Sequence, residues 1–560
     1  MEKEWSAKQI SDWIAQGALR KEAVWERVDK AVRGSYSSAF DGEPKPILPS
    51  LFHSLSTPDG LLTEAAFIAL LQTKGYLLRS PDGAAAGKIL FSSLAYLSTL
   101  PFPSSTLPPS DGLSLAQLAR ALVWIVPDNY GCIVEEGNLS RQRSKADHRR
   151  LIFQSLASRL EPKPHYDAES ARRLALHNAF EVEYESRREY CALNHDDDGD
   201  EIYHDLLDVL YGTQIAYDPR YSSVPRDDFR PVAKQLAAEQ DLDQLYALGI
   251  PVDRFVAFAK VLVGLQFTQP VEYRDENGDM DLSRFDAAAR SVCAAFYPHN
   301  AEHGKDATPS VITWPMFDHG LKNVAPYLLD PLYHIISTIF MEKRGPGISY
   351  LLDPLSLLPN GTPLTMPLLS QLTTYLGGSL DFGSLRRTLH YSTADDLPKT
   401  SSELITAMEA IPEEAVLVFS AQSRENGTTY VFGVFSYKPR QDGSSIQTNV
   451  IPSYVGQERC AIFQLAPVQD VFRGVVGRPG WTVTDSDTVV FGQLGNGGVV
   501  LELKDGLRAA EITHRIPIAK SGDGDGDSGG GYVYEPNVWR GSWSASLHIS
   551  DIEIWTDQEV

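Results

Sequence analysis

Cysteine is scarce in this sequence, with four residues in 560 and no CxxC pair. Secreted scaffolds that depend on disulfides carry more cysteines at closer spacing than Cys132, Cys191, Cys293 and Cys460. Four isolated thiols are typical of a reducing compartment. The first residues are charged where a signal peptide has an apolar run, so we expect a cytoplasmic protein.

A long hydrophobic run is also missing. The best candidate, residues 255–267, contains Lys260 and is shorter than the roughly 18 apolar residues of a membrane span. Residue 2 is Glu, whereas N-myristoylation needs a glycine at that position. These absences predict a soluble chain with no transmembrane segment.

Basic residues are fewer than acidic ones: the chain has 50 Lys and Arg and 73 Asp and Glu, which gives a formal net charge of −23. Nucleic-acid binding needs a local excess of basic residues, and only short basic stretches such as 141–145 and 148–150 occur. We therefore expect no direct contact with nucleic acid. An acidic metabolic enzyme and an interaction protein both remain open.

The common catalytic motifs are absent: there is no GxSxG, GxxxxGK[ST], HExxH or strand-linked GxGxxG. The glycine-rich stretch 492–498 opens no helix, which argues against a phosphate cradle. A triad that assembles in space is not excluded by these absences. Cys460 lies in a β-run and is interpreted as a small buried hydrophobe. We assign no catalytic, cofactor-binding or metal-binding residue and no cofactor.

The patterning along the chain predicts three domains. At about 150 residues per domain, the length alone suggests three or four. Helical signals dominate residues 1–145 and 146–345, which we interpret as two helical lobes; one helix starts at the capping residue Thr63 and another at Ser114. Residues 346–560 are expected to form a β-rich domain.

Short strand-like runs follow residue 376 and favour a mostly antiparallel β-domain, such as a sandwich. An Asn426-Gly427 turn joins the first two runs. In the last run, 544–555, the apolar alternation changes phase at Ser550 and Asp551, which predicts a β-bulge. The expected fold class is therefore α+β, with a helical region followed by an antiparallel β-sandwich and flanking helices.

One acidic stretch, residues 275–286, has the spacing of an EF-hand calcium loop. Met280 stands where glycine permits the sharp turn, and the closing aspartate is shorter than the usual bidentate glutamate. A calcium site and a degenerate loop are both open, and the degenerate loop is favoured. The oxygen ligands would be Asp275, Asn277, Asp279, Asp281 and Asp286.

Two further polar stretches are interpreted as solvated loops. Residues 194–201 fit a calcium loop poorly, and residues 521–531 lack the distal carboxylate that would close one. Cys191, His195 and His204 have no second paired element that would complete a zinc site.

Several segments after residue 370 resemble the motifs of the TLDc domain family and occur in the family order. With a helical region before them, the whole chain is similar to the fungal family named restriction of telomere capping protein 5, which pairs a degenerate EF-hand-like region with a TLDc domain. The segments are 372–378 with 389–392, 416–419, 430–436, 461–467, 497–503 and 552–555.

The resemblance implies a small β-sandwich flanked by helices, with no established catalytic residues. TLDc proteins are linked to oxidative-stress resistance and to binding the vacuolar proton-pumping ATPase (V-ATPase), and the fungal family is named for an influence on telomere capping. The resemblance therefore predicts a non-enzymatic cytoplasmic protein that acts through protein–protein interaction. The segment before the last strand and Glu2 depart from the family pattern.

Two other functions remain open. One is an enzyme of oxidative-stress chemistry that uses Cys460 or a histidine-containing cleft. The other is a calcium-responsive adaptor that uses the stretch 275–286. For the interaction protein, Trp539 and Trp543 are either exposed aromatic anchors or ordinary packing residues of the sandwich, and packing is favoured.

Overall fold

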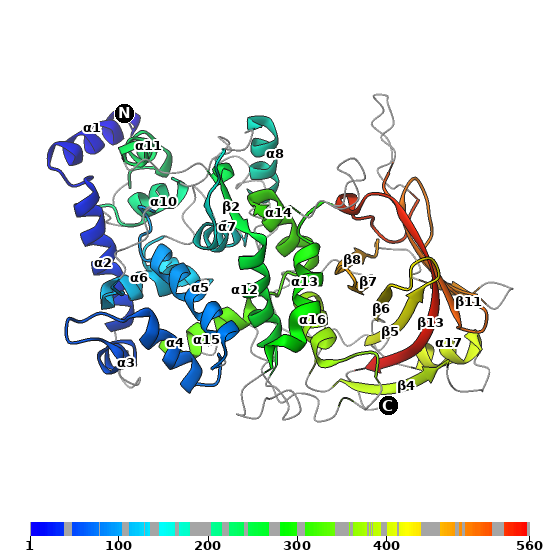
Figure 1. Cartoon of the computed structure of the whole chain (residues 1–560). Coiled ribbons are helices and arrows are strands. Elements are labelled where there is room, and N and C mark those ends of the chain that lie inside the picture. Colours follow the sequence, from blue (N-terminus) through cyan, green and yellow to red (C-terminus); the bar gives the residue numbers. More distant parts are fainter. Residues whose placement is uncertain are drawn as a thin grey trace. The chain divides into compact units, whose positions relative to one another are not determined.

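The computed structural model shows an α+β protein whose chain divides into two compact units (Figure 1). The first unit contains residues 1–258, 310–318 and 331–346, and the second contains 259–309, 319–330 and 347–560. The domain boundaries near residues 145 and 345 stay a prediction. The structure describes residues 2–37, 47–77, 79–103, 111–127, 129–134, 145–162, 167–179, 203–215, 223–239, 245–267, 281–298, 309–341, 358, 362–377, 380, 382, 385–393, 400–410, 414–437, 460–475, 481–483, 488–517 and 531–556.

The first unit is built mainly from helices, and a three-stranded antiparallel sheet joins distant parts of its sequence. The sheet has the order β1-β2-β3, with Ile250 opposite Ile312. Its strands are β1 (Ser158–Arg159), β2 (Leu248–Pro251) and β3 (Val311–Thr313). The helices are α1 (Glu2–Ala15), α2 (Lys21–Ser37), α3 (Ile47–Leu55), α4 (Glu64–Thr73), α5 (Pro81–Leu97), α6 (Leu115–Ile125), η1 (Asn129–Cys132), α7 (Lys145–Leu156), α8 (Ala168–Ala179), α10 (His204–Gly212), η2 (Arg226–Phe229), α11 (Arg230–Glu239), η3 (Leu245–Ala247), α14 (Trp314–His319) and α15 (Asp330–Phe340). Helix α12 (Val252–Gly264) continues into the second unit.

Two helix starts in this unit confirm the caps predicted from the sequence. The Thr63 hydroxyl accepts a hydrogen bond from the Ala66 N–H at the start of α4. Ser114 and Gln117 form a reciprocal capping box at the start of α6, which satisfies two backbone N–H groups that the helix itself leaves unpaired.

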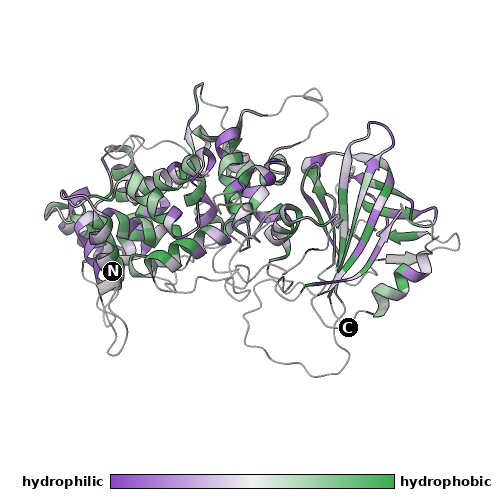
Figure 2. Cartoon of the chain, turned by 60° about the horizontal axis from the view of Figure 1, so that its bottom comes forward, coloured by the Kyte–Doolittle hydropathy of each residue, from purple (hydrophilic) through white to green (hydrophobic). Residues whose placement is uncertain are grey.

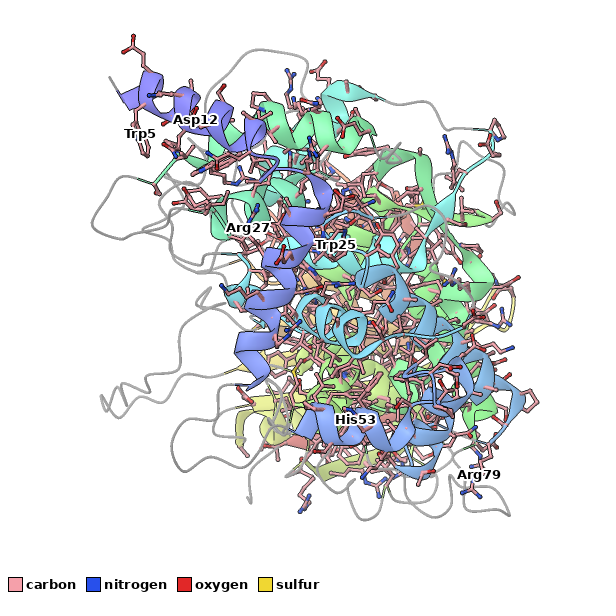
Figure 3. All side chains as sticks on the ribbon, turned by 90° about the vertical axis from the view of Figure 1, so that its left-hand side faces the viewer. Trp5, Asp12, Trp25, Arg27, His53 and Arg79 are labelled. Carbon is pink, nitrogen blue, oxygen red and sulfur yellow. The ribbon has the colours of Figure 1, made fainter. Side chains whose placement is uncertain are left out.

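Helix α7 lies inside the first unit, because every residue from Ala146 to Leu156 is buried. Trp5 of α1, on the face of the first unit seen in Figure 3, is by contrast 41% exposed. Trp25 of α2 is covered by Arg120, whose guanidinium carbon lies 4.0 Å from the centroid of the Trp25 ring. Among the described residues, none of the helices has the length and apolar character needed to cross a membrane.

The second unit combines helices with one antiparallel sheet. Its helical elements are η5 (Leu282–Phe285), α13 (Asp286–Ala294), the π-helical turn η7 (Gly320–Val324), α16 (Met366–Leu376), α17 (Ser401–Ala410) and η9 (Val538–Arg540). The strands are β4 (Arg386–Ser392), β5 (Glu414–Ser423), β6 (Thr429–Tyr437), β7 (Ala461–Ala466), β8 (Asp470–Arg473), β9 (Trp481–Val483), β10 (Val489–Phe491), β11 (Gly498–Lys504), β12 (Ala509–Arg515) and β13 (Trp543–Thr556).

Ten strands of the described residues form this sheet in the order β8-β7-β6-β5-β13-β12-β11-β10-β9, with β4 paired to β13 beside that path. One side of β13 pairs with β5, and the other pairs first with β12 and then with β4. The register against β5 shifts between Ile549 and Asp551, which confirms the predicted bulge. The predicted Asn426-Gly427 turn also joins β5 to β6, with Gly427 at φ +69.

Hydrogen bonding runs through one sheet, which differs from the sandwich of two separate sheets that we expected. The physical reason is the length of β13, which lets it pair with strands of both halves. Apolar residues of β5–β8 and of β10–β13 still line one shared core, against which Leu404, Ile405 and Met408 of α17 pack. Hydrophobic positions recur along these strands in Figure 2.

The outer edge of β8 is covered by the chain segment that precedes the last strand. The Glu535 N–H donates to the Arg473 carbonyl at 2.8 Å, and the Val475 N–H donates to the Val533 carbonyl at 2.7 Å. Covering a sheet edge satisfies backbone groups that would otherwise invite pairing with another chain. It also places residues 537–541, which follow this segment, next to β8.

Candidate functional site

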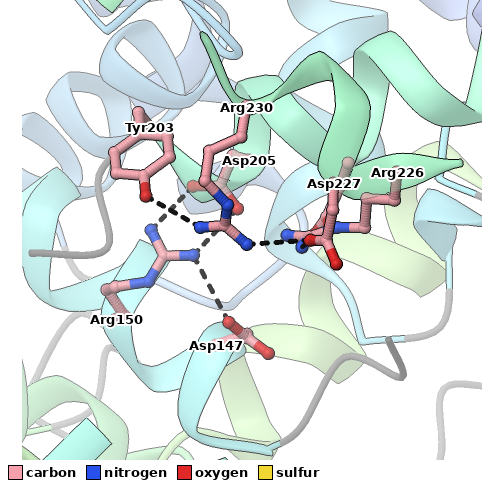
Figure 4. Close-up of polar contacts among 8 residues, drawn as sticks. Asp147, Arg150, Tyr203, Asp205, Arg226, Asp227 and Arg230 are labelled. Atoms are coloured by element: carbon pink, nitrogen blue, oxygen red, sulfur yellow. Dashed lines mark hydrogen bonds and ion pairs between the residues drawn. The ribbon is translucent and has the colours of Figure 1, made fainter. Parts of the chain in front are cut away.

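The basic stretch 148–150 is buried in the first unit. His148 and Arg149 are each 8% exposed, and Arg150 is fully buried. The Arg150 guanidinium donates to both carboxylate oxygens of Asp205, at 2.7 and 2.9 Å, and lies 3.5 Å from Asp147 (Figure 4). Because Arg149 also pairs with a carboxylate of the protein, Asp318, at 2.7 Å, neither arginine is available to a phosphate group.

A second set of ion pairs links α10 to η2 and α11. Buried Arg226 pairs with Asp208 of α10 at 2.6 Å. Arg230 donates to Asp227 at 2.9 Å and to the Tyr203 hydroxyl at 3.0 Å (Figure 4). A buried ion pair that loses one partner destabilises a protein strongly. We therefore assign this charge network a structural role in holding α7, α10, η2 and α11 together.

A second buried polar cluster, in the second unit, surrounds Asp470 at the start of β8. The Asp470 carboxylate is fully buried and accepts hydrogen bonds from Asn537 Nδ2 at 2.8 Å and from the Arg540 guanidinium at 3.2 Å. Its Oδ1 also accepts from the Val471 N–H. Burial raises the pKa of Asp470 above its ordinary value, while Arg540 and Asn537 oppose that rise.

His514 of β12, also fully buried, belongs to the same cluster. Its Nδ1 lies 2.6 Å from the Gly541 carbonyl oxygen, and its Nε2 accepts from the Asn537 N–H at 2.9 Å. These partners assign the neutral tautomer with the proton on Nδ1. Burial lowers the pKa of His514 to about 4, against the raising effect of the Gly541 carbonyl.

Asp470 and His514 together hold a short turn of residues 537–541, which we call the 537–541 turn. Asn537 Oδ1 accepts from the Trp539 N–H at 3.0 Å and so starts η9, and Gly541 adopts φ +63, a conformation that favours glycine. Between them, the Val538 side chain is 59% exposed, the highest fraction among the exposed large hydrophobic residues of the described chain.

The structure places the two candidate aromatic anchors in packing contacts. Trp543 is partly buried and packs against the core of the sheet. Its ring stacks on the His514 ring, with the two ring centroids 5.9 Å apart. Half-buried Trp539 stacks on His319 with ring centroids 4.2 Å apart. The packing interpretation of Trp543 is confirmed, and the apolar side chain that the turn exposes most is Val538.

The candidate calcium stretch is only partly visible, because residues 275–280 lie outside the described chain. Asp281 caps η5, accepting from the Ser283 N–H at 3.1 Å and hydroxyl at 2.6 Å. The hydroxyl and backbone bonds of Ser283 lower the pKa of Asp281. Asp286, the twelfth position of the loop, lies 2.6 Å from the Lys260 ammonium. The Lys260 ammonium thus contacts the carboxylate that would complete the coordination shell of a bound Ca²⁺ ion.

Calorimetric titration of the full chain with millimolar Ca²⁺ is expected to give only the heat of dilution, because Asp281 and Asp286 are engaged in contacts within the protein. A Lys260→Met variant serves as the comparison, since it removes the ammonium from Asp286. Saturable heat from the unaltered chain would contradict the prediction and restore the calcium-responsive adaptor.

The other candidates from the sequence are not brought together in the described residues. Cys191, His195 and the acidic runs 196–200 and 523–527 lie outside them, while His204 is fully buried at the start of α10. Within the described chain, no group of three or more His, Cys, Asp or Glu side chains is placed to hold a metal ion. Cys460 is half-buried and packs against the core of the sheet.

Asp470, His514, Asn537 and Arg540 are not among the functional residues predicted from the sequence. One signal was present, because Asp470 directly precedes the apolar pair Val471-Phe472, and a charge at the edge of a strand needs a partner. Nothing in the sequence shows that this partner lies 70 residues along the chain, at Arg540.

Comparison with known proteins places the chain in no family: none of the protein-family models matches it, and no curated protein does. The family that the sequence motifs resemble therefore stays a prediction.

Proposed function

We propose that this chain is a non-enzymatic cytoplasmic protein of the TLDc type that docks on a partner complex through its 537–541 turn. The proposed partner is the peripheral sector of the V-ATPase, whose assembly the chain would regulate. A link to oxidative-stress resistance and an indirect influence on telomere capping belong to the same proposal.

The exposed side chain of Val538 carries the proposal, because it projects from a turn that buried groups hold in place. A side chain presented on backbone that is already ordered loses little motion on binding, so less conformational entropy opposes the contact. The flanking residues Asn537 and Arg540 are tied to Asp470, so the presentation does not depend on a partner.

The arrangement of the TLDc-like segments supports the proposed type of domain. Residues 416–419 and 430–436 lie in the adjacent strands β5 and β6, and residues 461–467 begin with the next strand, β7. The segments 497–503 and 552–555 fall on β11 and β13 of the same sheet. Segments recognised separately in the sequence therefore contribute to one folded unit.

The test is affinity purification of the full chain from a lysate of its own organism, quantified by mass spectrometry. Subunits of the peripheral V-ATPase sector are expected to be enriched over an untagged control. A Val538→Asp variant is expected to capture about tenfold less, because a carboxylate in an apolar interface is left unpaired.

Ser544→Asp is the matched control, since it adds the same charge at an exposed position of β13 outside the turn. It should capture as much as the unaltered chain. No enrichment of V-ATPase subunits would refute the partner, and equal capture by the Val538→Asp variant would refute the turn as the docking surface.

A further inference from the structure

The 537–541 turn is hydrogen-bonded at both ends to groups that are fully buried. At its start, the Asn537 N–H donates to His514 Nε2 and the Asn537 amide donates to Asp470. At its end, the Arg540 guanidinium pairs with Asp470 and the Gly541 carbonyl bonds to His514. Two strands that are distant in the sequence, β8 and β12, thus fix one turn.

The stability of the sheet does not by itself account for a buried carboxylate at Asp470. Phe472, two residues further along β8, fills the shared core with an apolar side chain. Replacing a buried ion pair by apolar residues is often neutral or stabilising. A buried ion pair is therefore weak evidence that its role is to stabilise the fold. What Asp470 contacts is the turn, through Asn537 and Arg540.

We infer that Asp470 and His514 are positioning residues that hold the 537–541 turn in its binding conformation before the partner arrives. This inference rests on the proposed docking function and adds how the surface is kept ready. A turn that is already ordered binds without paying the entropy of ordering its backbone and side chains. Neither residue touches the partner itself, because both are fully buried.

Hydrogen exchange of the full chain tests the inference without a partner. In an Asp470→Asn variant, the amides of Asn537, Trp539 and Arg540 are expected to exchange about tenfold faster, because the turn opens locally. The amides of the β11–β12 ladder serve as the internal control and should keep their protection. Unchanged exchange in the turn would overturn the inference.

A substitution at a fully buried site can also unfold the sheet, so a second variant acts from the turn side. Arg540→Gln removes the cation of the pair at a side chain that is 12% exposed. It should accelerate exchange in the turn while the β11–β12 ladder stays protected. A turn that keeps its protection in this variant would likewise overturn the inference.

A reciprocal swap separates positioning from general damage. The double variant Asp470→Asn with Asn537→Asp keeps one carboxylate and one amide across the same 2.8 Å contact. It should restore most of the turn protection and of the V-ATPase capture that Asp470→Asn loses. Failure to restore either would argue against positioning.

The capture assay separates the two proposals. Faster turn exchange with about tenfold weaker V-ATPase capture in Asp470→Asn supports both. Faster turn exchange with undiminished capture overturns the positioning role and leaves the docking function standing. Absence of capture by the unaltered chain overturns the docking function, and with it the binding role of the turn.

Discussion

Replacing Arg150 by methionine is expected to lower the free energy of unfolding of the helical unit by about 3–5 kcal/mol. The Arg150 side chain is fully buried and lies between the carboxylates of Asp147 and Asp205. Its removal leaves two buried negative charges without the cation that contacts both. Urea unfolding followed by far-UV circular dichroism measures the loss.

Arg173→Met is the matched control, because Arg173 is 69% exposed, lies 4.0 Å from Glu169 and donates to the exposed Ser170 hydroxyl at 3.2 Å. Exposed pairs of this kind contribute about 0–1 kcal/mol, so the control should differ little from the unaltered chain. A second substitution, Asp205→Leu, added to Arg150→Met should recover part of the loss by removing one of the buried charges. Equal stability of the Arg150→Met and Arg173→Met variants would contradict the structural role of the network.

Acidification from pH 6.5 to 4 is expected to destabilise the second unit by about 3 kcal/mol for each of two histidines, the fully buried His514 and the half-buried His319. Burial lowers the pKa of His514 to about 4, and burial together with Lys322 lowers the pKa of His319 to about 4. In the unfolded chain, both histidines take up a proton near pH 6.5. The contribution of the two neutral histidines to the free energy of unfolding is therefore complete above pH 6.5. It falls as the pH drops to 4 and is lost below pH 4.

Asp470 opposes part of this trend, because its raised pKa means that the folded state takes up a proton earlier than the unfolded state does. The comparison with His514→Gln isolates the histidine, since glutamine offers a donor and an acceptor but does not titrate. Between pH 6.5 and 4.5, this variant should lose about 2–3 kcal/mol less than the unaltered chain in urea unfolding. His548→Gln, at an exposed position of β13, serves as the control for replacing a histidine by glutamine elsewhere in the same sheet.

Local features of the fold were readable from the sequence because they depend on neighbouring residues. Thr63 and Ser114 cap helices as predicted, and the phase change at Ser550 gives the bulge in β13. The single continuous sheet was not readable in the same way. It depends on which strands β13 pairs with, and that pairing joins residues far apart in the sequence.

The candidate site was predicted only in outline, as a stretch around Trp539 and Trp543. The sequence leaves open whether the two tryptophans are exposed anchors or packing residues, and it favours packing. Stacking on His319 and packing on the core settle that for the two tryptophans, and Val538 is left exposed. The contacts to Asp470 and His514 required the tertiary structure.

The position of β13 in the sheet also bears on the order in which the protein is made. Strands β5–β8 and β9–β12 leave the ribosome before β13, yet among the described strands the ladder hydrogen bonds connect the two groups through β13. Each half-sheet must therefore wait with an unpaired edge until residues 543–556 have been synthesised, and such edges favour aggregation. We expect this unit to complete its folding after translation of β13 and to depend on chaperones during that interval.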